Sequence, residues 1–79
     1  MNRVRFAELH ANCVTAMRSY FAQVEKTSGM LAECLAVPPT FKIRFKLMSQ
    51  GIAEHDAHLA YLGARRLLFS AARISPSSN

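Results

Sequence analysis

The densest group of side chains that could do chemistry is Glu54-His55-Asp56-Ala57-His58. On a helix His55 and His58 would be neighbours three residues apart, and imidazoles with a carboxylate are common ligands of transition metals. The di-iron bundle motif has its glutamate three residues before the histidine, whereas Glu54 precedes His58 by four. We therefore predict no metal site and no cofactor. We expect His55 on the buried face of a helix and the other polar residues of the group in solvent.

Signatures of nucleophilic catalysis are missing from the sequence. There is no G-x-S-x-G turn and no glycine-rich phosphate loop, and the chain has only three glycines. Cys34 follows the acidic Glu33, while reactive thiolates need basic neighbours. Cys13 and Cys34 would lie about 31 Å apart on one straight helix, too far for a disulfide. We predict two free thiols and no enzymatic activity.

Basic residues gather in the second half of the chain. The net charge is +5, and residues 41–79 hold six of the ten bases but only two of the five acids. Such a balance fits a solvated helix face, an acidic partner, nucleic acid or an anionic membrane surface. The candidate contacts to a protein partner or to nucleic acid are Lys42, Arg44, Lys46, Arg65 and Arg66.

Residues 30–48 resemble part of a helix-turn-helix. Met30–Ala36 followed by Val37-Pro38-Pro39-Thr40 is similar to the first helix and turn of that motif, with Ala36 in place of the turn glycine. The resemblance implies a recognition helix over 41–48 that would present Lys42, Arg44 and Lys46 to DNA. Two further alternatives are a ribbon-helix-helix with a strand at 41–47, and a basic amphipathic helix at a membrane surface over 59–73.

Apolar residues in the first half recur with alternating steps of four and three, which is typical of a helix that packs along one face. This row comprises Phe6, His10, Cys13, Met17, Tyr20, Val24, Thr27, Leu31 and Cys34. Val37-Pro38-Pro39 ends the helix, because proline lacks an amide hydrogen and keeps the residue before it out of the α region. We predict a helix over about 3–36 and a turn at 37–39.

The second half contains the least certain segment. Residues 41–47 alternate apolar and basic side chains as a half-buried strand would. A helix over about 40–73 has the advantage that its apolar face continues along the whole segment and that a single strand would have no partner. The face that we predict comprises Phe41, Phe45, Met48, Ile52, His55, Leu59, Leu62 and Phe69. Residues 75–79 are expected to form a disordered tail.

Together these patterns predict an all-α fold, an antiparallel helical hairpin forming one domain over 1–74. Residues whose numbers add up to about 78 should face each other, so that His58 lies opposite Tyr20 and Gly29 lies at the level of Gly51. These two glycines would permit a close approach of the helices or a kink. Two such hairpins are expected to dimerise into a four-helix bundle. The residues expected to hold the association seam are Met17, Tyr20, Val24, Leu31, Phe45, Ile52, Leu59 and Leu62.

The function that follows is a small non-enzymatic module for protein–protein interaction, of an accessory, chaperone-like or inhibitor type. It would act as a homo-oligomer and bind a further protein partner. The alternative is the helix-turn-helix DNA-binding regulator. No apolar run reaches the roughly 18 residues that a membrane span needs, and no signal peptide is evident, so we expect a cytoplasmic protein.

Overall fold

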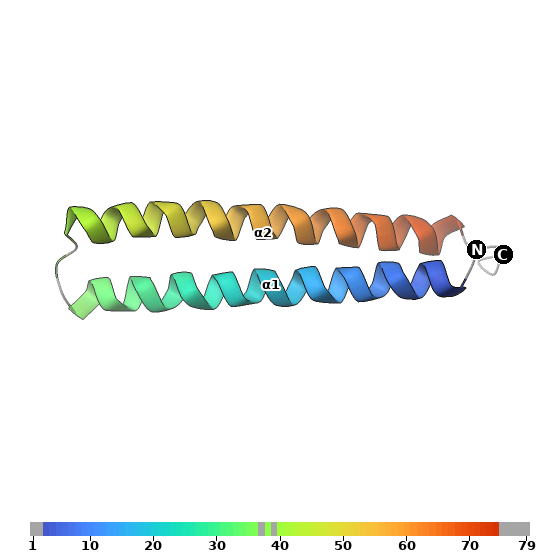
Figure 1. Ribbon diagram of the computed structural model, residues 1–79, viewed down its shortest axis with the longest axis horizontal. Helices are drawn as coiled ribbons and strands as arrows, with labels where there is room; N and C mark the ends of the chain where they lie inside the picture. Colours follow the sequence, from blue (N-terminus) through green and yellow to red (C-terminus); the bar gives the residue numbers. More distant parts are fainter. Residues whose placement is uncertain (1–2, 37, 39, 75–79) are drawn as a thin grey trace.

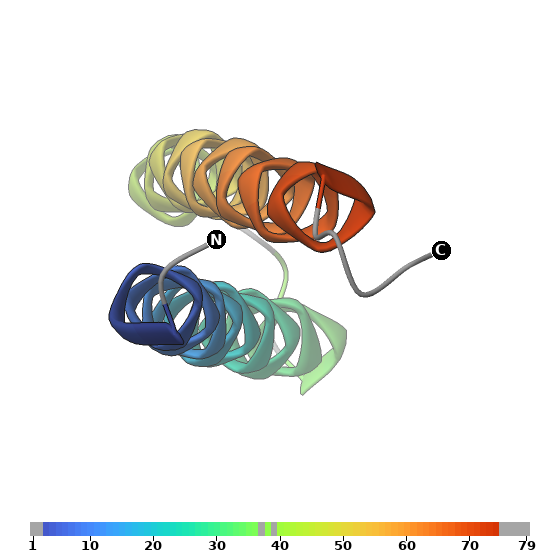
Figure 2. The same cartoon turned by 90° about the vertical axis from the view of Figure 1, so that its right-hand side faces the viewer.

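A computed structural model describes residues 3–36, 38 and 40–74 of the chain. It consists of two helices, α1 (Arg3–Ala36) and α2 (Phe41–Ile74), which run antiparallel side by side (Figure 1). The hairpin is a rod with extents of 58 × 19 × 15 Å. The two helices are slightly inclined to each other when seen end-on (Figure 2). The all-α hairpin predicted from the sequence is confirmed, and the helix bounds expected from the periodicity differ from these by at most one residue.

Residues 41–47 form the first turns of α2, so the strand alternative and the ribbon-helix-helix that needs it are wrong. Thr40 caps this helix. Its side-chain Oγ1 accepts a hydrogen bond from the backbone N–H of Ile43 at 3.3 Å, and its carbonyl accepts one from the N–H of Arg44 at 3.0 Å. A threonine at the N-cap satisfies a backbone donor that the helix itself leaves unpaired. The predicted turn at 37–39 and the predicted tail at 75–79 fall largely outside the described residues.

The residues at the contact between the helices recur at alternating steps of four and three on both α1 and α2. This is the pattern of two helices packed along their length. We call this row of buried and half-buried residues the interhelical seam. On α1 it comprises Leu9, Cys13, Ala16, Tyr20, Gln23, Thr27, Met30 and Cys34, and on α2 Ile43, Leu47, Gln50, Glu54, Ala57, Tyr61, Ala64, Leu68 and Ala71.

The seam buries little apolar surface. Among the described residues only Leu9, Leu68 and Ala71 are buried apolar side chains, and they cluster at the end of the hairpin away from the loop. Nearer the loop the buried residue is Gln50. Its Nε2 donates to the carbonyl oxygen of Gln23 at 3.1 Å and to its side-chain Oε1 at 2.8 Å. This paired amide crosses the seam where a leucine would be expected.

Aromatic rings pack across the middle of the hairpin. Tyr20 of α1 stacks on His58 with ring centroids 4.7 Å apart, and on Tyr61 at 6.1 Å. The expectation that His58 lies opposite Tyr20 is therefore correct. His55, predicted to lie on the buried face, is exposed, whereas Glu54 and His58, predicted to lie in solvent, are half-buried. The predicted assignment of the two histidines is therefore wrong, because α2 is rotated about its own axis relative to the predicted orientation.

The glycines do not bring the helices together. Both helices are continuous through Gly29 and Gly51, and a Cβ added at either position would meet nothing within 4 Å. Both residues are exposed. The predicted close approach at this level is wrong, because these glycines face away from the seam.

Candidate interaction surfaces

Most of the large apolar side chains lie outside the seam. Fourteen of them are exposed among the described residues, from Val24 at 37% to Leu35 at 91%. A monomer exposes single apolar residues without consequence, but continuous rows of them mark an interaction surface. The arrangement of these rows around the two helices therefore decides what the hairpin can bind.

One broad side of the hairpin carries apolar rows from both helices. In an antiparallel pair, equivalent flanks of the two helices lie on the same side of the seam. The contact of Tyr20 with His58 marks this flank on α2. We call this side the apolar face; its large members are Val14, Met17, Phe21, Val24, Leu31 and Leu35 on α1, with Phe41, Met48, Leu62 and Phe69 on α2.

The opposite broad side is polar. We call it the polar face; it comprises Arg5, Asn12, Ser19, Lys26 and Glu33 on α1, with Lys42, Lys46, Ser49, Asp56 and Ser70 on α2, and Leu67 is its large apolar exception. The hairpin is thus two-sided. One side is suited to solvent and the other to contact with further helices.

A third row runs along the back of α2, turned away from α1. Phe45, Ile52 and Leu59 follow one another at heptad spacing and are 63%, 61% and 53% exposed. The residues predicted to hold the association seam fall into two groups that differ in exposure. Met17 and Tyr20 are half-buried, whereas Val24 and Leu31 on α1 and all four on α2 are exposed. Those on α2 lie outside the interhelical seam, and their part in contact between chains stays a prediction.

The hairpin is much more extended than a globular protein of its length. Its radius of gyration is 17.8 Å, against about 12 Å for a compact domain of this size. Its accessible surface is 6276 Å², against about 4,800 Å² for a compact monomer of this mass. The difference, roughly 1,500 Å² for one chain, is nearly twice the area of about 800 Å² that each partner buries in a standard protein–protein interface.

The basic residues predicted to contact a partner are all exposed, but they do not share one face. Lys42 and Lys46 lie one turn apart on the polar side, whereas Arg44 lies between them in sequence and on the flank of the apolar face. Further along, the guanidinium of Arg65 lies over the ring of Phe69, 5.0 Å from its centroid. Arg66 is on the back of α2.

The helix-turn-helix arrangement is not the one observed. That motif sets a short second helix at a steep angle to the first, whereas α2 is 34 residues long and runs back along α1. The cations expected on a recognition helix therefore point in different directions around a long helix. Their placement no longer favours the reading of base edges.

No metal site is formed by the part of the chain that the structure describes, since no three of its histidine, cysteine and acidic side chains come together. Cys13 and Cys34 are free thiols, half-buried in the seam. Within residues 3–36 and 41–74, neither helix has an apolar stretch sufficient to cross a membrane.

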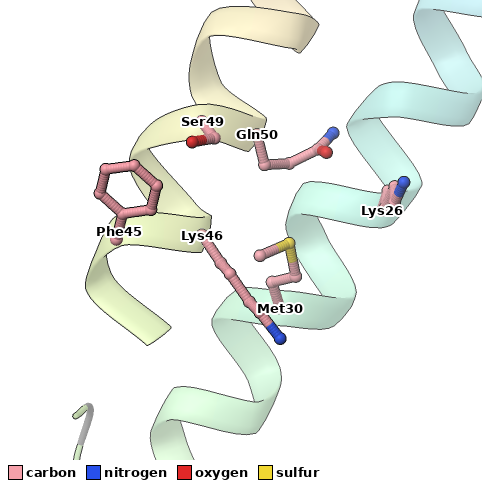
Figure 3. Close-up of a pocket in the computed structure, with 6 residues that line it drawn as sticks. All are labelled: Lys26, Met30, Phe45, Lys46, Ser49 and Gln50. Carbon is pink, nitrogen blue, oxygen red and sulfur yellow. The ribbon is translucent and has the colours of Figure 1, made fainter. Parts of the chain in front are cut away.

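A groove opens between the helices on the polar side, in the half of the hairpin near the loop. It has a volume of about 350 Å³. Lys26 and Met30 of α1 line one side (Figure 3). Lys46, Ser49 and Gln50 of α2 line the other, and Phe45, from the row along the back of α2, lies at its outer edge. In Figure 3 the side chain of Met30 points towards α2, and Lys46 extends across the groove beside it.

The cations of this groove are not neutralised by the groove itself. No acidic residue is among its lining residues, and neither Lys26 nor Lys46 takes part in an ion pair among the described residues. Lys46 is among the contact residues predicted from the sequence, whereas Lys26 and Met30 are not. The signal that could have found them is the seam spacing, which places Met30 in the seam and Lys26 on its edge.

Comparisons of the chain with protein-family models, with curated proteins and with solved structures found no match.

Proposed function

We propose that this protein is a non-enzymatic module for protein–protein interaction that acts as a homo-oligomer, in which two hairpins pair through their apolar faces to form a four-helix bundle. The observation that carries this proposal is the placement of the large side chains. The seam includes four alanines and the amides of Gln23 and Gln50, whereas all five phenylalanines and five of the eight leucines lie outside it and are exposed.

The shape of the apolar stripe on α1 supports a bundle of four. Each helix in such a bundle contacts two neighbours, so its apolar stripe must be wider than the seam of a two-stranded coil. On α1 the stripe continues from seam residues such as Tyr20 through Val24 to Phe21 and Leu35, about 100° further round the helix. One edge of this stripe meets α2, and the other is available to a second hairpin.

The energetics point the same way. Burying one large apolar side chain contributes about 1.5 to 3 kcal/mol, and chains of this length are marginal when they fold alone. A hairpin whose described residues include three buried apolar side chains gains little from its own seam. Pairing through the apolar face would supply the missing core, while the polar face would keep the assembly in solution and leave it available to a further partner.

The proposal is tested by one pair of variants that add the same charge to opposite sides of α1. Leu31→Asp places a carboxylate on the apolar face, where an unpaired buried charge costs several kcal/mol. Ser19→Asp places it on the polar face. We expect Leu31→Asp to dissociate the assembly or to reduce its helicity, and Ser19→Asp to leave both the mass and the circular dichroism spectrum unchanged.

If Leu31→Asp has the mass and helicity of the unaltered chain, the apolar face is not the interface and the proposal fails. A shift of labelled duplex DNA at low salt that is lost in Arg44→Ala would instead favour the DNA-binding alternative, since phosphate contacts are strongly salt-dependent. The mass measurement and the DNA measurement are independent of each other.

A further inference from the structure

The groove lined by Lys26, Met30 and Phe45 lies on the side of the hairpin that pairing through the apolar face would leave open. Lys26, Lys46 and Ser49 belong to the polar face, and Met30 and Gln50 are seam residues. The groove is therefore available to a partner in the monomer and in the proposed bundle alike.

The chemistry of the groove is a mixture of apolar floor and uncompensated positive charge. Met30 is half-buried, and Phe45 offers a ring that is 63% exposed. Lys26 on α1 and Lys46 on α2 stand at the rim, with no acidic residue in the lining. A lysine ammonium can donate three hydrogen bonds and has no acceptor, so the rim is suited to carboxylates.

The surroundings reinforce this selectivity for negative charge. Residues 40–53 contain Lys42, Arg44 and Lys46 but no aspartate or glutamate, and these three cations outnumber Glu33, the acidic residue of the polar face of α1 at their level. Among the described residues none of these three cations is held in an ion pair. An acidic partner would meet an attractive field over the first turns of α2, and a basic one would be repelled.

We propose that this groove binds an acidic amphipathic helix of a protein partner, with an apolar side chain of that helix between Met30 and Phe45 and its carboxylates on Lys26 and Lys46. Helices that lie in grooves use apolar anchors on one face, and glutamates one turn apart would reach ammonium groups on the two walls. This inference rests on the proposed role as an interaction module and names the chemistry of the partner.

The probe is a fluorescein-labelled helical peptide of about 20 residues, a length sufficient for a stable helix, with leucines on one face flanked by glutamates. Binding to the full chain is followed by fluorescence anisotropy. A peptide with glutamine at every glutamate position is the control for charge. We expect the acidic peptide to bind and the neutral one to bind at least about tenfold more weakly, with an affinity that falls as salt is added.

Two matched pairs of protein variants locate the site. Lys26→Glu with Lys46→Glu should weaken binding by about tenfold or more, whereas Arg18→Glu with Arg66→Glu, an equal change in charge away from the groove, should change it by less than about threefold. Phe45→Ala should weaken binding without any change in charge. Leu67→Ala, which removes an exposed apolar side chain of the polar face away from the groove, is its control.

Equal losses from the two charge-reversal pairs would overturn the proposal, because binding would then be a general response to net charge. Displacement of the peptide by duplex DNA at a lower concentration than by unlabelled peptide would also overturn it. The solution mass is measured on the same samples. A dimer that does not bind the acidic peptide refutes this inference alone, whereas a monomer that binds it refutes the proposed self-association and leaves the groove assigned.

Discussion

The interhelical seam and the apolar face are both apolar stripes of the same two helices, yet they are made of different residues. Beside a few large residues such as Leu68, the seam contains many small and polar side chains such as Ala57 and Gln50, whereas rings and long aliphatic chains such as Phe21 and Leu62 lie on the apolar face. In a self-sufficient hairpin the large residues would be in the seam, because burial is where they stabilise most. This difference is the reason why we propose that the seam aligns the two helices and that a second hairpin supplies the larger hydrophobic contribution.

Two neighbouring leucines of α2 have different surroundings, one in the seam and one on the polar face. Leu68 is a seam residue with 9% exposure, and Leu67 next to it lies on the polar face with 58%. Leu68→Ala should lower the free energy of unfolding by about 2 to 3 kcal/mol, through lost burial and the cavity left behind. Leu67→Ala should cost less than about 0.5 kcal/mol. Urea unfolding at one chain concentration measures both.

Equal losses from the two leucines would break the comparison. They would mean that the polar face is covered as thoroughly as the seam, and the two-sided description of the hairpin would be wrong.

A smaller effect is expected from the amide pair that crosses the seam. Gln50→Ala removes the donor to both oxygens of Gln23 and should cost about 1 to 2 kcal/mol, since the acceptors stay partly buried. A double-mutant cycle with Gln23→Ala should give a coupling energy of about 0.5 to 1 kcal/mol. The backbone carbonyl of residue 23 is still present in Gln23→Ala, so the coupling energy reports only the bond between the two side chains. It is therefore smaller than the whole loss of stability in Gln50→Ala. Additive effects would show that the side-chain bond at 2.8 Å contributes nothing.

The smallest effect is expected at a glycine of the polar side. Gly29 is helical and exposed, and an added Cβ meets nothing. Gly29→Ala should therefore raise the free energy of unfolding by about 0.5 to 1 kcal/mol, seen as a higher midpoint in thermal unfolding. Gly51→Ala, on the flank of the apolar face, is the comparison. A loss of stability in Gly29→Ala would reveal that another chain packs on the side that we describe as free.

The hairpin itself could be predicted from the sequence. The spacing of four and three from Phe6 to Cys34 predicts a long helix, Pro38-Pro39 predicts its end, and antiparallel pairing then brings His58 to the level of Tyr20. These features depend only on helical geometry and on the chemistry of proline, so they hold whatever the helices pack against.

The rotation of α2 could not be predicted in the same way. Two rows on this helix share the heptad spacing, one with Phe45, Ile52 and Leu59 and one with Leu47, Tyr61 and Leu68. The size of the side chains alone predicts that the first row packs against α1, but in the structure the second row does so. A single sequence does not tell which of two apolar stripes meets its own chain and which meets another. The groove at Lys26 and Lys46 depends on this rotation and was missed for the same reason.

The most direct test of the account is the mass of the unaltered chain in solution, measured by light scattering after size-exclusion chromatography over a series of micromolar concentrations. If the large apolar residues pack against a second hairpin, the mass should be twice the 8.8 kDa of the chain. It should decrease when the chain is diluted to concentrations near the dissociation constant of the dimer. A helical species that remains at 8.8 kDa throughout the series would contradict the proposed self-association.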